Sequence, residues 1–230
     1  MDPIEELTKK QLMEGFLSER WEYSSEDYGL ALNQLLSALA KSGSLSDVLI
    51  LVNSSIESVK FAGVWLAAIW GKEAASIFDE IKGLIHSDNK DIRYELMDCY
   101  LEFASSGRSV LDLVKCLDDD ELSHRLKALN YIKFLSDSQI FSAYEYALKE
   151  EDSYCKYLSI LKDIYEPEFV AAEIQKDLGS EDCLYKRFNY IAALRGGEGI
   201  DVLRNLARVS GDFDIKAYFE RYENNKVRLG

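Results

Sequence analysis

Two histidines and four cysteines are the residues of this chain whose types could bind a metal ion or act as nucleophiles. His86 and His124 stand far apart and form no His-x-x-x-His pair, the spacing that puts two metal ligands on one helix face. The sequence also lacks a Cys-x-x-Cys pair, a Gly-x-Ser-x-Gly motif and a phosphate-binding glycine loop. It therefore predicts no catalytic residues, no metal and no cofactor, and reduced cysteines packed in helices.

Acidic side chains form the clearest local pattern. Runs of acids at 118–121, 150–152 and 181–182 all fall in predicted turns between helices. In a stack of helices such turns lie about 10 Å apart, so the runs would form an acidic ridge. Acids at these places also cap helix N-termini and complement the helix dipole, and that structural role is the alternative interpretation.

A second group of acids stands on one predicted helix. Glu95, Asp98 and Glu102 are spaced by three and four residues, which places them on one helix face. Tyrosines, which combine apolar area with a polar tip, stand near both groups and suit a protein interface. The expected partner-binding residues are Tyr94, Glu95, Asp98, Glu102, Asp118, Asp119, Asp120, Glu121 and Tyr131.

The overall charge restricts the class of partner. The chain has 41 acidic and 27 basic side chains, a formal net charge of −14. An acidic surface repels the phosphates of nucleic acids and of anionic membranes and attracts cationic proteins. The N-terminus lacks a basic and apolar leader pattern, and no apolar stretch approaches the ~18 residues of a membrane span. We expect a cytoplasmic protein with a basic protein partner, without nucleic acid or membrane; the oligomeric state stays open.

A basic residue recurs along the chain at nearly constant spacing. The six positions, separated by 33, 32, 31, 30 and 30 residues, are Lys60, Arg93, Arg125, Lys156, Lys186 and Lys216. All but the first follow an acid by four or five positions, the acids being Asp88, Asp120, Asp152, Asp182 and Asp212. A period of this length in a chain with helical patterning indicates stacked helix pairs.

The residue four positions after each repeated base predicts where the stack ends. In chain order these residues are Val64, Met97, Leu129, Ile160, Tyr190 and Glu220. A terminal repeat has no neighbour to cover it, so the polar Glu220 predicts a C-terminal cap. We expect a single domain over 1–230, with N-terminal cap helices at 1–44, repeats at 45–210 and the C-terminal cap at 211–230.

Apolar spacing predicts the individual helices. Residues at intervals of three and four predict one helix over 72–86 and another over 92–104. Ser24, with an acid three positions later, predicts a capping box that opens a helix ending near Lys41. Pro167 suits the first turn of a further helix.

The segment 59–70 is apolar on all sides. Such a helix is normally buried by its surroundings. The alternative is that Trp65 or Trp70 stays exposed and anchors a partner.

Taken together, these repeats resemble HEAT-type α-solenoid units, with examples at 47–71, 72–107 and 108–136. The resemblance implies an all-α fold, a right-handed superhelix of about six to seven helix pairs. In that family, the acid of the turn and the base of the second helix form polar ladders. The resemblance thus implies pairing of Asp88 with Arg93 and of Asp120 with Arg125.

Three functions stay open at this point. The first is a non-enzymatic binding protein that sequesters a basic partner, similar to an immunity protein (antitoxin) that neutralises a cognate toxin. The second is a general adaptor scaffold. The third is an enzyme, because one group of alkylpurine DNA glycosylases has HEAT-like repeats; those proteins line the concave surface with lysine and arginine, where this chain is expected to have Glu95, Asp98 and Glu102. We therefore expect a protein that is not an enzyme.

Overall fold

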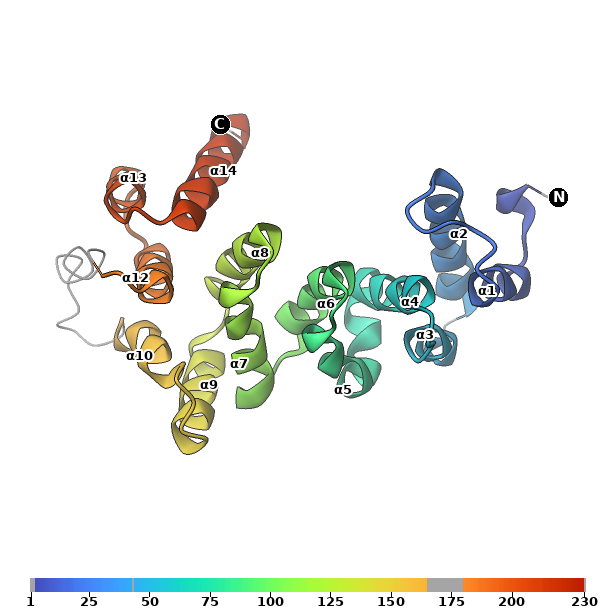
Figure 1. The fold of residues 1–230 in the computed structure, drawn as a ribbon, viewed down its shortest axis with the longest axis horizontal. Coiled ribbons are helices and arrows are strands. Elements are labelled where there is room, and N and C mark those ends of the chain that lie inside the picture. Colours follow the sequence, from blue (N-terminus) through green and yellow to red (C-terminus); the bar gives the residue numbers. More distant parts are fainter. Residues whose placement is uncertain (1–2, 43, 165–179, 230) are drawn as a thin grey trace. The chain divides into compact units, whose positions relative to one another are not determined.

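The computed structural model describes residues 3–42, 44–164 and 180–229, and all regular elements within these ranges are helices (Figure 1). The expected all-α fold is confirmed for this part of the chain. The chain packs as two compact units, Met1–Phe103 and Ala104–Gly230. In the described ranges, none of the helices is both long and apolar enough to cross a membrane.

The described residues of unit 1 form α-helices with several 3-10 segments between them. In chain order the elements are η1 (Ile4–Glu6), α1 (Lys9–Leu17), α2 (Glu26–Ser42), α3 (Leu45–Val52), α4 (Glu57–Trp70), η2 (Gly71–Ile77), α5 (Phe78–Ile81), η3 (Lys82–His86) and α6 (Lys90–Phe103). Helix α4 packs against α3 and α6, and α6 also packs against η2 and η3 (Figure 1). The core of unit 1 contains buried apolar side chains from α1, α2, α3, α4 and α6, among them Phe16, Leu35, Leu51, Leu66 and Leu96.

The described residues of unit 2 also form α-helices, with one 3-10 segment. Its described elements are α7 (Gly107–Lys115), η4 (Cys116–Asp118), α8 (Leu122–Ile132), α9 (Asp137–Lys149), α10 (Cys155–Asp163), α12 (Cys183–Arg195), α13 (Ile200–Val209) and α14 (Phe213–Leu229). Helix α9 packs against α7 and α10, and α12 packs against α10 and α13. Helix α14 packs against α13 and α8, so the last helix returns to an earlier part of this unit.

The repeated bases occupy equivalent places in the helices. Each lies in the first turn of an even-numbered helix, from Lys60 in α4 to Lys216 in α14. The apolar residues four positions later are all buried, whereas Glu220 is exposed. The five apolar residues thus face the interior, and the polar residue at the sixth position faces solvent.

The helix expected over 72–86 is a different structure. It consists of the 3-10 segments η2 and η3 with the single α-turn α5 between them. Gly83 disfavours an α-helix at this point, and the carbonyl of Lys82 accepts a hydrogen bond from the Tyr100 hydroxyl at 2.7 Å. Apolar spacing alone does not separate the two helix types, because three residues per turn also places Ala74, Ile77 and their neighbours inward.

Two further expectations concern helix starts. Helix α2 is capped by Ser25, whose hydroxyl accepts a hydrogen bond from the Tyr28 amide at 3.1 Å. The predicted capping residue Ser24 instead has φ 65°, a left-handed conformation in the preceding turn. The expected helix start at Pro167 lies outside the described residues.

Candidate functional site

The expected binding residues fall in both units. Tyr94, Glu95, Asp98 and Glu102 lie on α6 of unit 1, whereas the acids at 118–121 and Tyr131 belong to unit 2. Tyr94 and Tyr131 are both half-buried. The two groups thus belong to separate units.

Four acids form a row along α6. Asp91, Glu95, Asp98 and Glu102 follow one another at intervals of four, three and four residues and so share a helix face. Glu102 is exposed and the other three are half-buried. We call these four residues the acidic row; Asp91 extends the predicted set by one helical turn, and the same spacing rule could have identified it.

Helix α4 has an apolar row of its own. Phe61, Trp65 and Ile69 are spaced by four residues; the first two are half-buried and Ile69 is 54% exposed. The opposite side is tightly packed, because a Cβ on Gly63 would lie 2.6 Å from the Val52 backbone nitrogen on α3. The expectation that α4 is buried on every side is therefore wrong. Because the segment 59–70 is apolar on all sides, its composition does not indicate which side of α4 is partly exposed.

The acidic row and the apolar row lie side by side. At their N-terminal ends Tyr23 joins them: its hydroxyl donates to Asp91 at 2.6 Å, and its ring lies 5.3 Å from the Phe61 ring. The C-terminal ends of the rows are also close together. Gly71, the residue after α4, lies so near Glu102 that a Cβ on Gly71 would be 3.5 Å from Oε2 of Glu102. We call the two rows together the α4–α6 face.

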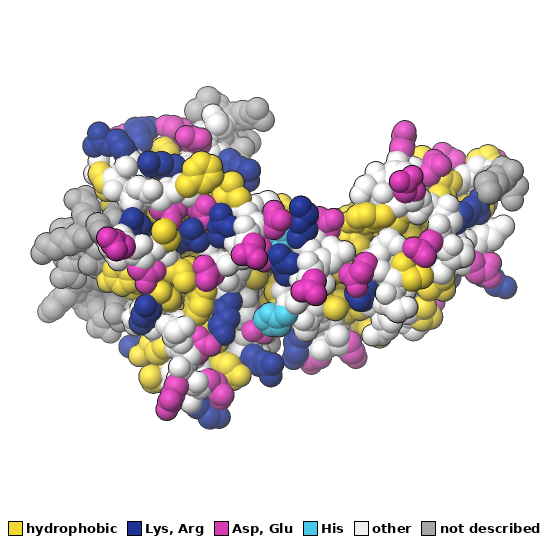
Figure 2. Space-filling view, viewed as in Figure 1, with side chains coloured by type: hydrophobic (Ala, Val, Ile, Leu, Met, Phe, Trp, Pro, Cys, Tyr) yellow, Lys and Arg dark blue, Asp and Glu magenta, His cyan; other side chains and the backbone are white. Residues whose placement is uncertain are grey.

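The electrostatics of Tyr23 reflect this arrangement. Burial raises the pKa of the Tyr23 phenol, and the hydrogen bond to Asp91 and the charges of Asp91 and Glu95 raise it further. Figure 2 shows apolar side chains at the surface of unit 1 close to α2 and α4, with acidic side chains beside them. The α4–α6 face thus combines negative potential with apolar area.

The acids at 118–121 of unit 2 belong to a turn that is held by arginines. Arg125 donates to the carbonyl oxygens of Asp119 and Asp120 at 2.7 and 2.8 Å. Its carboxylate partner is Asp214, with Nε to Oδ2 at 2.6 Å. The ladder expected between the Arg125 and Asp120 side chains is therefore replaced by a backbone contact. Arg93 donates in the same way to the carbonyls of Ser87 and Asp88.

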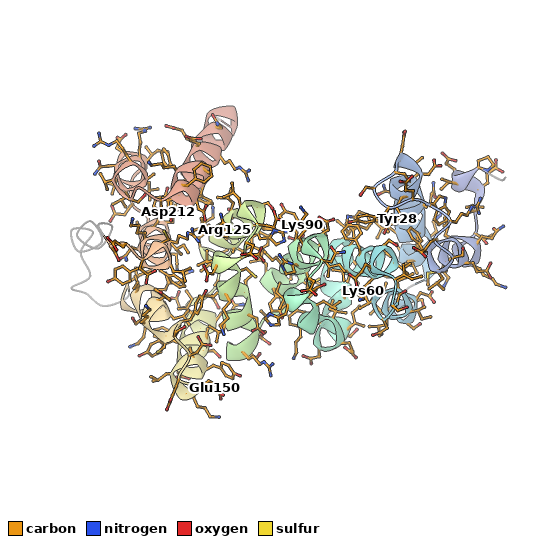
Figure 3. The ribbon with its side chains drawn as sticks, in the orientation of Figure 1. Tyr28, Lys60, Lys90, Arg125, Glu150 and Asp212 are labelled. Atoms are coloured by element: carbon orange, nitrogen blue, oxygen red, sulfur yellow. The ribbon has the colours of Figure 1, made fainter. Side chains whose placement is uncertain are left out.

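Arg125 is part of a buried ion cluster in unit 2. Arg187 donates to Asp214 at 2.7 Å, to Asp212 at 3.3 Å and to the Leu117 carbonyl at 2.6 Å. Both aspartates are almost fully buried, and the labelled Arg125 and Asp212 lie on neighbouring elements (Figure 3). The cluster of Arg125, Arg187, Asp212 and Asp214 was not predicted from the sequence, since Arg187 and Asp214 lie outside the repeated positions.

In each of the two following turns one acid forms contacts within unit 2. Lys115 pairs with Asp152 at 2.6 Å, and Asp182 accepts from Tyr157 at 2.7 Å and lies 3.4 Å from Lys156. Burial would raise the pKa of Asp152, but hydrogen bonds from Lys115 and the Tyr154 amide lower it overall. These contacts agree with the structural interpretation of the turn acids, although Asp118 and Asp120 remain exposed.

The residues capable of metal binding or nucleophilic chemistry are dispersed. Glu121 and His124 stand three residues apart, but His124 is buried beside Ser123, and the described residues contain no cluster of three or more potential metal ligands. Cys99 and Cys116 are buried and Cys155 is half-buried, as expected; Cys183 is exposed, which was not predicted from the sequence.

Comparisons with known proteins add no family. Neither the models of protein families nor the curated proteins gave a match to this chain.

Proposed function

We propose that this protein is a non-enzymatic binding protein that sequesters a basic partner protein. The observation that supports this most is the α4–α6 face, where an apolar row lies beside an acidic row. Apolar area supplies affinity and a rim of charge supplies selectivity in protein interfaces. Unit 1, which carries this face, has 18 acidic and nine basic residues, a formal charge of −9.

The proposed architecture is a HEAT-like, right-handed α-solenoid of about six to seven helix pairs. The equivalent positions of the repeated bases in the even-numbered helices support it. A single domain with caps at 1–44 and 211–230 follows from the same proposal. An experimental structure in which successive helix pairs rotate in the opposite sense would contradict it.

The biological role that we propose is inhibition of a cognate toxin in the cytoplasm, as an immunity protein. The partner would be a basic toxin domain, which an acidic inhibitor attracts and covers. Coexpression tests this directly: if a gene adjacent to the one for this protein encodes a toxin, the wild-type chain should restore the growth of cells that produce that toxin. Lack of rescue, together with lack of binding between the purified proteins, would reject the role.

Binding to a basic protein is tested separately from toxicity. The tagged full-length chain should retain a basic protein in stoichiometric amount, and raised salt should weaken that complex because charge contributes to it. Retention of an acidic protein, or salt-sensitive binding of duplex DNA in a gel shift, would contradict the proposal. Strong DNA binding would favour the glycosylase alternative.

A further inference from the structure

The α4–α6 face has the dimensions and chemistry of a site for one helix. We propose that it binds an amphipathic α-helix of the partner, with large apolar side chains on one stripe and lysines or arginines on the adjacent stripe. This inference rests on the proposed function, because it takes the occupant from a basic partner protein. It adds the element of that partner and the surface that receives it.

The two rows have similar lengths and run side by side. At ~1.5 Å per residue the apolar row is about 12 Å long and the acidic row about 16 Å long. The contacts through Tyr23 at one end and the approach of Gly71 to Glu102 at the other keep the rows together along this length. A partner helix of about three turns would contact both rows at once.

The spacing of the apolar row suits the packing of another helix. Phe61, Trp65 and Ile69 form an i, i+4, i+8 ridge. Such ridges pack into the grooves between the side chains of another helix, and helical partners are recognised through residues at i, i+3, i+4 and i+7. Trp65 at the centre is the residue type that most often anchors an interface.

Charge complementarity determines the second stripe of the partner helix. The acidic row lies along one side of the ridge, so an apolar helix without cations would bring apolar atoms against the exposed carboxylate of Glu102. Unit 1 as a whole carries a formal charge of −9. Negative potential therefore selects a cationic helix and disfavours anionic lipid and nucleic acid.

The proposal is tested with a synthetic helix and the full-length chain. The probe is a fluorescein-labelled 18-residue peptide with leucine and tryptophan on one stripe and lysine on the next. Fluorescence anisotropy should show that it binds at least tenfold more tightly than two controls. One control has the same composition in scrambled order, and the other has glutamate in place of lysine.

Two matched pairs of variants locate the binding. Ile69→Lys should weaken peptide binding at least tenfold, about 1.4 kcal/mol, whereas Ile50→Lys should change it less than twofold. Both isoleucines are about half exposed, at 54% and 51%, but Ile50 lies on α3. Glu102→Lys should weaken binding likewise, and Glu80→Lys, an exposed acid on α5, is its control. Circular dichroism must be unchanged in all four.

Several results would overturn the inference. Three of these results concern the peptide: the scrambled peptide binds equally well, the designed peptide does not bind, or the two variants of a matched pair have equal effects. The fourth is a dimer in sedimentation that Ile69→Lys dissociates, since a second copy of the chain would then cover the face. The proposed function is separable. If a basic partner protein binds the Ile69→Lys and Glu102→Lys variants normally but loses affinity with Asp118→Lys and Asp120→Lys, only the helix site is rejected. If no basic protein binds the wild-type chain, the function itself is rejected.

Discussion

At the scale of single residues, the strongest constraint is the buried ion cluster of unit 2. Removing charges from water is costly, and a buried pair is tolerated only when each charge has close partners. Asp214 meets this condition because both Arg125 and Arg187 donate to it. The hydrogen bond to Asp214 raises the pKa of the Arg125 guanidinium, although burial acts in the opposite direction. The cluster links η4 and α8 to the start of α14.

The substitution Asp214→Asn should destabilise the protein by about 3–5 kcal/mol, because the buried Arg187 and the half-buried Arg125 would lose the carboxylate that they share. The matched control is Asp201→Asn, which removes a pair with Arg204 at an exposed carboxylate and should cost less than about 1 kcal/mol. Urea unfolding followed by circular dichroism measures both. Equal midpoints for the two variants would show that the cluster does not stabilise the fold.

The repeated bases show what sequence spacing can and cannot predict. Their position in the first helical turn follows from a local pattern, and that part was predictable. The partner of Arg125 was not, because Asp214 is 89 residues away and the pairing depends on how α14 packs against α8. The acidic row was predictable because its residues recur at intervals of three and four. The apolar row beside it could not be predicted, because only the packing of α3 on α4 determines which side of α4 is covered.

At the scale of elements, close approach between helices determines several positions. Gly107 opens α7, where a Cβ would lie 2.2 Å from the Ser142 carbonyl oxygen on α9. The sequence predicts that Gly107 ends the repeat at 72–107. In the structure it is instead the first residue of α7, which Ser106 caps by accepting a hydrogen bond from the Ser109 amide. The contact between α7 and α9 therefore depends on the missing side chain of Gly107.

Gly107→Ala should destabilise unit 2 by about 1–3 kcal/mol, since either α7 or α9 must move to admit a methyl group. Gly29→Ala is the control. Gly29 lies in α2, where a Cβ would meet no other atom within 4 Å, so alanine there should stabilise the helix by about 0.5–1 kcal/mol. Thermal unfolding should shift in opposite directions for the two variants, and a shift in the same direction would contradict this account.

At the scale of the whole molecule, buried tyrosines in both units make the free energy of unfolding depend on pH. Burial is the main cause that raises the pKa of Tyr28 in unit 1 and of Tyr154, Tyr190 and Tyr218 in unit 2. In the unfolded chain a tyrosine titrates near pH 10. The folded pKa values are higher, so the stabilisation is complete below about pH 10 and is lost as the pH rises through that value toward the folded pKa values.

The free energy of unfolding should therefore fall steeply above pH 10. Absorbance at 295 nm should show that part of the 14 tyrosines ionises near pH 10 and that the rest ionise only together with the loss of helical circular dichroism. In concentrated urea all should titrate near pH 10. Complete ionisation of the folded chain near pH 10 would mean that these phenols are accessible to water.

The charge of unit 1 makes a kinetic prediction for the complex. Long-range attraction acts on the encounter, and short-range packing acts on dissociation. With the cationic peptide, raising the ionic strength from about 0.01 M to 0.15 M shortens the Debye length from roughly 30 to 8 Å and should lower the association rate constant at least tenfold, with a smaller change in dissociation.

Glu102→Lys should reduce the association rate and its salt dependence. Ile69→Lys should act mainly by speeding dissociation, because it removes apolar contact and leaves most of the charge of unit 1 in place. Stopped-flow fluorescence separates the two rate constants; if both variants change only dissociation, electrostatic attraction by the acidic row has no part in the encounter.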